Sequence, residues 1–289
     1  MRKRTFSTIA LWFGLIAVLG LFGIQGAVWI IAAAAFFTQF ELYDMFQKMG
    51  YRPNWNSGLI SGLAITLGSY YFGISTYGSP NIEAGTDIFV FAVLIQCLIA
   101  VSSEKTRERL VSFLPTLIGI VYIPFMMHFL VRLILKCELE GFATSVALFL
   151  CIWVVAVAKF NDVGALLVGM VAGRHKLSPQ LSPKKTWEGA IGGVIVAGAT
   201  GIALLYFDRL FRLGFSPESF SYLNAGLMAI PIAVSGVASD LLASAFKRQA
   251  EVKDSGRWIP GIGGVFDLTD SIILAGPFAY LLYKITVFS

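Results

Sequence analysis

Apolar residues along this chain occur in long, uninterrupted blocks rather than in the stripes typical of an amphipathic helix. About 20 such residues cross the hydrocarbon core of a bilayer, and blocks of that length can be marked nine times. The pattern predicts an all-α polytopic membrane protein with about nine transmembrane helices. The blocks cover roughly residues 6–22, 27–46, 57–76, 86–102, 110–131, 142–160, 187–207, 222–246 and 265–287.

The chain begins with three basic residues before its first apolar block, which is also how a signal peptide begins. However, the second block follows directly after residues 23–26, with no soluble stretch between the two. We therefore interpret this region as a first transmembrane hairpin. Since no long repeat or soluble segment interrupts the later blocks, the sequence predicts a single membrane domain over residues 1–289.

Charged residues make up 13% of the chain, against about 25% in soluble domains. With nine spans, 17 of the 22 Lys and Arg residues fall on the side of the N-terminus and five on the other side. The positive-inside rule then places the N-terminus in the cytoplasm and the C-terminus outside. This asymmetry explains the net charge of +5 without a nucleic-acid partner. Three unpaired cysteines and two histidines do not favour a disulfide framework or a zinc site.

Two carboxylates lie in the last apolar block, directly after a glycine-rich run. Asp267 and Asp270 are three residues apart and would share one face of a helix. Ionisable groups inside a membrane are costly and usually functional, and two carboxylates on one face suit a hard cation such as Mg²⁺. Gly263 and Gly264 would let the backbone approach a ligand closely. The alternative is that the aspartates cap the start of the helix.

The eighth block ends with a polar stripe. Asp240, Ser244, Lys247 and Arg248 have the spacing that places side chains on one side of a helix. Asp240 lies deep in the apolar run and needs a partner, whereas Lys247 and Arg248 alone could be ordinary charges at the membrane edge. The alternative to a catalytic role is a buried aspartate–lysine pair.

A basic motif precedes the seventh block. Ser182 fits a helix N-cap and Pro183 fits the first helical turn. Lys184 and Lys185 would then oppose the helix dipole, which is understandable if a polyanion binds there. The alternative is that both lysines simply anchor the helix at the membrane surface.

Small residues recur four apart on both sides of this motif. Residues 169–173 and 189–193 each begin and end with glycine, a pattern that indicates close helix packing. Asn161 and Asp162 close the sixth block.

Together, the intramembrane aspartates and nearby cations predict that a metal-bound polyphosphate is handled at the cytoplasmic membrane edge, as phosphoryl or nucleotidyl transfer requires.

The stretch from Ser244 to Ser271 resembles the signature of the phosphatidate cytidylyltransferases, also called CDP-diacylglycerol synthases. The stretch 162–189 is similar to that family as well. The resemblance is specific over residues 160–275, the expected catalytic region, while in residues 1–140 only the pattern of spans agrees.

The resemblance implies transfer of CMP from CTP to phosphatidic acid or a related lipid phosphate, with release of pyrophosphate. It also implies Mg²⁺, alone or with a second cation, an active site on the cytoplasmic side of the cell membrane, and a homodimer. The residues it assigns are Asp240, Asp267 and Asp270 to the metal, Lys247, Arg248, Lys253 and Asp254 to catalysis, and Asp162, Lys184, Lys185, Thr186, Glu188, Ser244, Gly263 and Gly264 to substrate binding.

Two positions depart from the family pattern. Ile262 stands where the family usually has His, and Leu268 where it usually has Arg, so two polar groups are replaced by side chains that form no hydrogen bond. The lipid preference is therefore left open. Two other functions remain as alternatives: a CTP-dependent polyprenol or dolichol kinase, which would release CDP, and a transporter or scaffold without nucleotide turnover.

Overall fold

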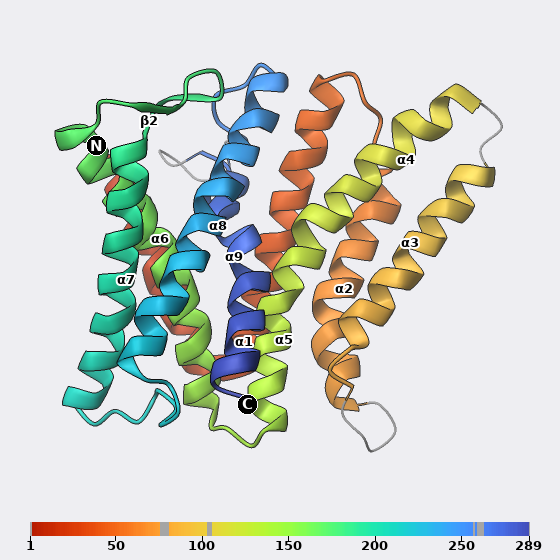
Figure 1. The fold of residues 1–289 in the computed structure, drawn as a ribbon. Coiled ribbons are helices and arrows are strands. Elements are labelled where there is room, and N and C mark those ends of the chain that lie inside the picture. Colours follow the sequence, from red (N-terminus) through yellow and green to blue (C-terminus); the bar gives the residue numbers. More distant parts are fainter. Residues whose placement is uncertain (1, 76–80, 103–105, 257, 259–262, 289) are drawn as a thin grey trace. The chain divides into compact units, whose positions relative to one another are not determined.

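The computed structural model describes residues 2–75, 81–102, 106–256, 258 and 263–288. Helices dominate it (Figure 1), which confirms the predicted all-α architecture. The helices are α1 (Arg2–Lys48), α2 (Trp55–Ser75), α3 (Ala84–Ser102), α4 (Thr106–Ile120), the π-helix η1 (Val121–Phe125), α5 (Met126–Leu139), α6 (Thr144–Ala172), α7 (Trp187–Leu210), α8 (Tyr222–Gln249) and α9 (Val265–Thr286). The strands β1 (Lys176–Ser178) and β2 (Ser182–Thr186) form an antiparallel hairpin between α6 and α7.

In the part of the chain that the structure describes, eight helical segments are long and apolar enough to cross a membrane. The first two predicted blocks are joined in α1, whose backbone leaves the helical conformation at Gly23 (φ 54°, ψ −129°). A Cβ on Gly26 would lie 2.7 Å from the carbonyl oxygen of Val18, although residues eight apart in a straight helix are about 12 Å apart along the axis. The chain therefore reverses sharply at Gly23, and α1 supplies both arms of the predicted hairpin.

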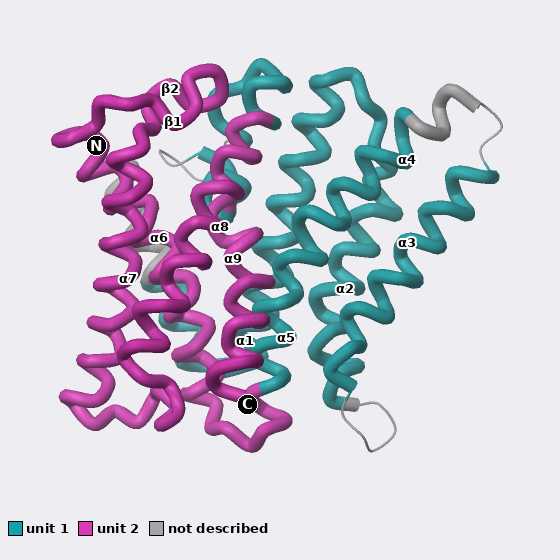
Figure 2. The backbone as a smooth tube through the Cα atoms, viewed as in Figure 1, with its two compact units in different colours: residues 1–136, 246–269 teal, residues 137–245, 270–289 magenta. Residues whose placement is uncertain are grey.

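The chain forms two compact units (Figure 2). Unit 1 contains Met1–Lys136 and Phe246–Thr269, and unit 2 contains Cys137–Ala245 and Asp270–Ser289. Helices α5, α8 and α9 each contribute to both units. That the two units make up one membrane domain stays a prediction.

Unit 1 packs around Tyr43 of α1, which is fully buried. Its hydroxyl donates to the carbonyl oxygen of Thr116 at 2.9 Å and accepts from the side-chain amide of Gln39 at 2.9 Å. A Cβ on Gly58 of α2 would lie 2.2 Å from the Tyr43 hydroxyl oxygen, and one on Gly119 of α4 would lie 2.1 Å from a ring carbon. Glycine at these two positions therefore lets α1, α2 and α4 close around one aromatic side chain.

In unit 2, α6 and α7 meet along a row of small residues, which we call the glycine seam. A Cβ on Gly189 would lie 2.7 Å from the carbonyl oxygen of Ala165, and a Cβ on Gly193 would lie 2.6 Å from the side-chain oxygen of Asn161. A real side chain would overlap the neighbouring helix at both places. The prediction that these glycines mediate helix packing is therefore confirmed.

Helix α6 ends at Ala172, beyond the end of the apolar block near residue 160. Asn161 and Asp162 therefore lie inside the helix and do not close it. Lys159 also lies inside α6. It was one of the 17 basic residues counted on the side of the N-terminus, where it was treated as a loop residue. The predicted boundary was wrong because hydropathy marks where the apolar run stops, while the helix continues along the glycine seam.

The seventh block and α7 both begin at residue 187, but the predicted N-cap of this helix was wrong. Ser182 begins strand β2 and pairs with Ser178, so it is not the N-cap. The N-cap of α7 is Thr186, whose hydroxyl accepts a hydrogen bond from the backbone N–H of Gly189 at 3.1 Å. Lys184 and Lys185 therefore lie on a strand before the helix, and the argument that they oppose its dipole does not hold.

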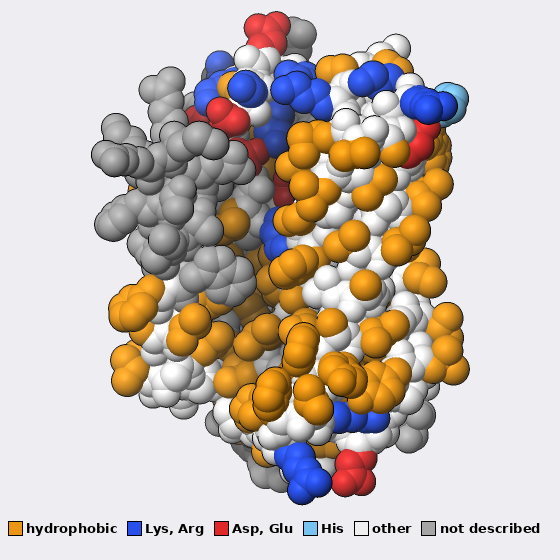
Figure 3. Space-filling model, turned by 90° about the vertical axis from the view of Figure 1, so that its left-hand side faces the viewer, with side chains coloured by type: hydrophobic (Ala, Val, Ile, Leu, Met, Phe, Trp, Pro, Cys, Tyr) orange, Lys and Arg blue, Asp and Glu red, His pale blue; other side chains and the backbone are white. Residues whose placement is uncertain are grey.

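The outer face of unit 2 is apolar along α6 and α7. In Figure 3, hydrophobic side chains cover the middle of this face, and Lys and Arg side chains gather at its two ends. This distribution fits helices surrounded by lipid, with their charges at the two water boundaries. The protein is an integral membrane protein. The exposed side chains on these helices include Leu166, Leu167, Met170, Ile191, Ile195, Tyr206 and Phe207.

Candidate functional site

Asp267 lies in the first turn of α9 and makes two kinds of contact within unit 1. One carboxylate oxygen is 2.6 Å from the Nζ of Lys247, and both side chains are only 14% exposed. The other oxygen accepts hydrogen bonds from the backbone N–H groups of Ser255, at 2.9 Å, and Gly264, at 3.2 Å. Asp267 therefore caps the start of the helix, as the alternative interpretation proposed, and also pairs with a lysine.

The glycine run makes this arrangement possible. Gly263 has a φ of 121°, in the region that L-residues avoid, and a Cβ there would lie 2.8 Å from the carboxylate of Asp267. The backbone at Gly263 does lie close to another group, while its predicted approach to a ligand stays a prediction. In this structure the group approached is the chain's own carboxylate.

Glu41 of α1 completes the polar cluster of unit 1, and sequence reasoning did not assign it to the site. It is 2% exposed and accepts hydrogen bonds from the hydroxyl of Ser255, at 2.7 Å, and from the backbone N–H groups of Val265 and Phe266, at 3.0 and 2.9 Å. The signal that could have identified it was present, because Glu41 is an ionisable residue inside an apolar block.

The other predicted residues of unit 1 lie near this cluster in the chain. Arg248, in the last turn of α8, and Lys253 and Asp254, in the following loop, are all exposed. Their catalytic roles stay predictions. Leu268 is half-buried on α9, and Ile262 lies outside the described residues.

In unit 2, Asp240 of α8 pairs with Lys185 of β2, and Oδ2 and Nζ are 2.5 Å apart. The prediction that Asp240 needs a partner is confirmed. Both side chains are about one-quarter exposed, at 23% and 25%, although the Nζ atom of Lys185 itself is buried. The contact brings together two residues that are 55 positions apart in the sequence. Spacing along a helix could not have predicted it.

A second lysine gathers two predicted carboxylates of unit 2. The Nζ of Lys159 lies 3.5 Å from the carboxylate of Asp162, 3.6 Å from that of Asp270 and 2.8 Å from the hydroxyl of Ser271. Asp270 is buried, at 8% exposure. Sequence reasoning missed both Lys159 and Ser271 as site residues, although a cation inside an apolar block was a signal for Lys159.

Two of the predicted substrate-binding residues hold the hairpin against α7. Thr186 is buried as the N-cap, as described above. Glu188 accepts hydrogen bonds from the backbone N–H groups of Arg174, at 3.1 Å, and His175, at 3.2 Å, and one of its oxygens is 2.5 Å from the His175 ring nitrogen Nδ1. Lys184, two residues before Thr186, is exposed.

On α8, Ser244 is half-buried one turn after Asp240, and its role in substrate binding stays a prediction.

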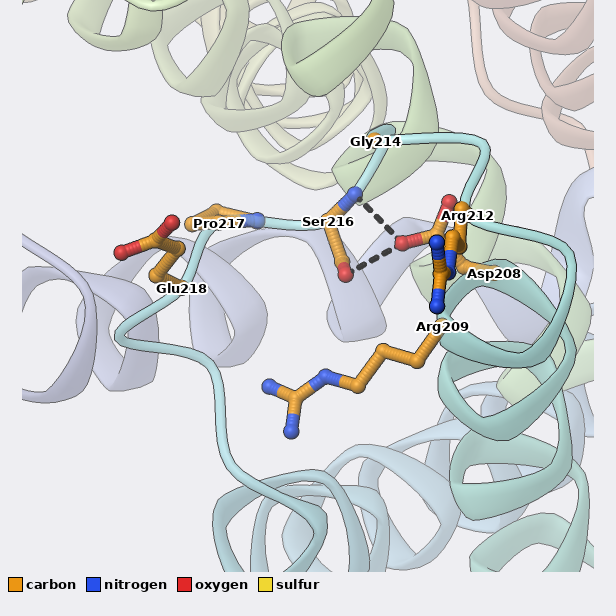
Figure 4. A pocket seen from close by; sticks show the side chains of 7 residues that line it. All are labelled: Asp208, Arg209, Arg212, Gly214, Ser216, Pro217 and Glu218. Atoms are coloured by element: carbon orange, nitrogen blue, oxygen red, sulfur yellow. Dashed lines mark hydrogen bonds between the residues drawn. The ribbon is translucent and has the colours of Figure 1, made fainter.

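A further charged pocket lies where α7 ends, and Figure 4 shows its lining residues. The carboxylate of Asp208 accepts hydrogen bonds from the backbone N–H of Ser216, at 3.0 Å, and from its hydroxyl, at 2.5 Å. Arg209 donates to the carbonyl oxygen of Phe220 at 2.6 Å. Since Asp208 and Glu218 offset the two lining arginines, the pocket has no excess positive charge for a polyphosphate.

Among the described residues, no three His, Cys, Asp or Glu side chains gather closely enough to hold an ion. The three predicted metal ligands each lie against a lysine: Asp240 against Lys185, Asp267 against Lys247 and Asp270 against Lys159. Their carboxylate oxygens are nevertheless the donors that Mg²⁺ prefers, so the donor set fits that ion. Metal ligation by these aspartates stays a prediction.

The fold defines a polytopic membrane protein. Its apolar helices carry aspartate and lysine side chains that pair with one another. A model of the cytidylyltransferase family matches residues 2–286, and the chain belongs to that family. This confirms the resemblance seen in the sequence.

Three curated relatives are phosphatidate cytidylyltransferases. The protein of Rickettsia bellii is 32% identical over 193 residues, which cover 66% of this chain and 79% of the relative. The protein of Bacillus subtilis is 29% identical over 225 residues, which cover 78% of this chain and 76% of the relative. The protein of Haemophilus influenzae is 37% identical over 152 residues, 52% of this chain and 51% of the relative.

Proposed function

We propose that this protein transfers CMP from CTP to phosphatidic acid, giving CDP-diacylglycerol and pyrophosphate. Family membership and the names of the relatives support this reaction. The structural observation that supports it best is that each of the three predicted metal ligands lies against a lysine. A protein without phosphate chemistry would gain little from keeping so many costly charges in apolar helices.

In the proposed reaction, an oxygen of the lipid phosphate attacks the α-phosphorus of CTP. The new P–O bond forms as the bond from the α-phosphorus to the bridging oxygen breaks, and pyrophosphate leaves with the electrons of that bond. Negative charge on the phosphate oxygens must be offset throughout, and prepositioned cations do this best. Lys185 and Lys247 are such cations, because each is held by a carboxylate.

The metal is a further part of the proposal. Asp240, Asp267 and Asp270 would hold Mg²⁺, alone or with a second cation, and the ion would supply positive charge to the triphosphate. Arg248 and Lys253 are exposed and therefore accessible to a phosphate that arrives from water. We assign them to binding the nucleotide or the lipid phosphate.

We further propose that the reaction takes place on the cytoplasmic side of the cell membrane and that the protein is a homodimer. The excess of Lys and Arg on the predicted cytoplasmic side supports the orientation. The lipid substrate would reach the site from the bilayer that surrounds the exposed apolar faces. The dimer rests on the family resemblance alone.

The deciding experiment is an assay of purified protein with CTP labelled at the α-phosphate, Mg²⁺ and phosphatidic acid. The expected result is label in the lipid and one pyrophosphate released per lipid labelled, with no transfer after chelation of the metal. A lipid kinase would instead release CDP and move a γ-phosphate label to a polyprenol. A panel of lipid phosphates should be included, because Ile262 and Leu268 replace polar residues. Failure to transfer CMP to any of them, from folded protein, would reject the proposal.

A further inference from the structure

Two polar residues of α1 contact the start of α9 within unit 1. Glu41 accepts hydrogen bonds from the N–H groups of Val265 and Phe266, the first two residues of α9. One turn away on α1, Thr38 lies with its hydroxyl 2.8 Å from that of Thr269, and both are buried. The first N–H groups of a helix have no partner within it, so Glu41 supplies from another helix what a local cap normally provides.

Glu41 also holds the loop that precedes α9. The hydroxyl of Ser255 lies 2.7 Å from one oxygen of Glu41. A Cβ on Gly256 or on Gly264 would come within 2.2 Å of the carboxylate oxygens of Glu41. Two glycines of the loop therefore provide the space that this one buried side chain occupies.

Through Ser255, Glu41 is linked to Asp267. The Ser255 hydroxyl is within hydrogen-bond distance of both carboxylates, at 2.7 Å from Glu41 and 3.0 Å from Asp267, and its single proton can be donated to one of them at a time. The backbone N–H of Ser255 donates to Asp267 as well. A shift of the Glu41 carboxylate would therefore move the loop that holds the Asp267 carboxylate.

We propose that Glu41 is a positioning residue for the metal- and phosphate-handling carboxylate of Asp267. It acts through Ser255 and through the first turn of α9, and it touches no substrate itself. The inference rests on the proposed function, because Asp267 is a reactive-site residue only if the protein handles a metal-bound nucleotide. Its structural part, that Glu41 holds the loop in place, stands independently of that function.

The test compares Glu41→Gln with Thr38→Val. Glutamine keeps the shape of Glu41 but has one acceptor oxygen for three donors, and it adds an N–H₂ group that can only donate. Thr38→Val is a matched control, because it removes a buried contact between the same two helices without touching the loop. Glu41→Gln should raise the Mg²⁺ concentration for half-maximal CMP transfer at least tenfold, while Thr38→Val should lower thermal stability and leave the Mg²⁺ requirement unchanged.

A second measurement does not depend on activity. Lys253 is exposed in the same loop, so trypsin cleavage after Lys253, followed by mass spectrometry, reports how firmly the loop is held. Cleavage should be faster in Glu41→Gln than in wild type or Thr38→Val, at a temperature where all three are folded. Ser255→Ala removes the hydroxyl that connects Glu41 with Asp267 but keeps the backbone N–H that donates to Asp267. It should also speed cleavage and raise the Mg²⁺ requirement, and it provides the test if Glu41→Gln does not fold.

The outcomes separate the two proposals. If folded Glu41→Gln and Ser255→Ala match wild type in both cleavage and Mg²⁺ requirement, the positioning role is wrong while the proposed function stands. If wild type transfers no CMP, the proposed function fails. In that case faster cleavage in Glu41→Gln would support the hold on the loop alone, and unchanged cleavage would overturn it too.

Discussion

Lys185 of β2 lies 2.5 Å from the carboxylate of Asp240 on α8, while its neighbour Lys184 is exposed. Two adjacent lysines of one motif are thus placed in different environments. One is tied to a spanning helix and the other faces solvent. The chain therefore contains a matched pair of lysines with which to separate a specific contact from general positive charge.

Lys185→Ala should lower CMP transfer at least tenfold and also destabilise the protein, because Asp240 loses its cation. Breaking a fully buried pair costs about 3–5 kcal/mol, and exposed pairs contribute about 0–1 kcal/mol, so this partly exposed pair should cost about 1–2 kcal/mol. Lys184→Ala should leave thermal stability unchanged. Initial rates at saturating CTP and melting curves measure both effects, and equal melting of the two variants would contradict a stabilising pair.

Asp267→Asn should abolish most transfer while the protein remains folded. One side-chain oxygen remains for the N–H groups of Ser255 and Gly264, but the negative charge that faces Lys247 is lost. Asp267→Ala loses the cap as well and should be less stable than Asp267→Asn by about 1 kcal/mol. Transfer assays and thermal unfolding of both variants distinguish the two contributions. A folded, fully active Asp267→Asn protein would show that the carboxylate serves only as a cap.

Thr186→Ala tests whether a predicted substrate-binding residue acts on substrate or on the fold. Its hydroxyl caps α7, and loss of such a cap typically costs about 1 kcal/mol. We therefore expect lower thermal stability with an unchanged KM for CTP. The opposite result, an unchanged melting temperature with a raised KM, would return Thr186 to the binding site.

Reporter fusions at the two ends of the chain test the topology. The reversal at Gly23 gives α1 two arms, so the chain crosses the membrane an odd number of times if every segment spans. A reporter at the N-terminus should be cytoplasmic, and one at the C-terminus should be external. An internal fusion after Arg212, expected to be external, is the control. Both ends on one side would exclude the nine-span topology.

Hydropathy alone was sufficient to predict the spans. For a segment of about 20 residues, the free-energy cost of exposing apolar residues to water decides whether it lies in the bilayer. Hydropathy placed α7 to within three residues but missed the end of α6 by 12 residues, at Ala172 instead of 160. The hairpin β1–β2 depends on backbone pairing between Lys176 and Thr186, and hydropathy carries no signal for that contact. The N-cap of α7 was mispredicted for a related reason, because Ser182 and Thr186 are both acceptable N-caps.

The signature residues were found, but which of them pair with one another was not. Asp240 and Asp267 are recognisable because aspartate in an apolar run is rare, and Lys185 and Lys247 were predicted as site residues as well. The pairing was not predictable, because each aspartate lies against a lysine of another element. Glu41 was recognisable by the same criterion. A carboxylate in an apolar block should therefore be considered as a hydrogen-bond acceptor for the backbone N–H groups of a motif, even when it is far from that motif in the sequence.

The glycine seam between α6 and α7 has a consequence for tolerance to mutation. Because backbone atoms of one helix touch glycines of the other, even one methyl group at Gly189 or Gly193 has no room. On the opposite face of α7, Ile191 and Ile195 are exposed and should accept any apolar residue. A saturation mutagenesis screen of α7 should therefore alternate between intolerant and permissive positions with the helical repeat. The phase of that alternation would identify the lipid-facing side in living cells.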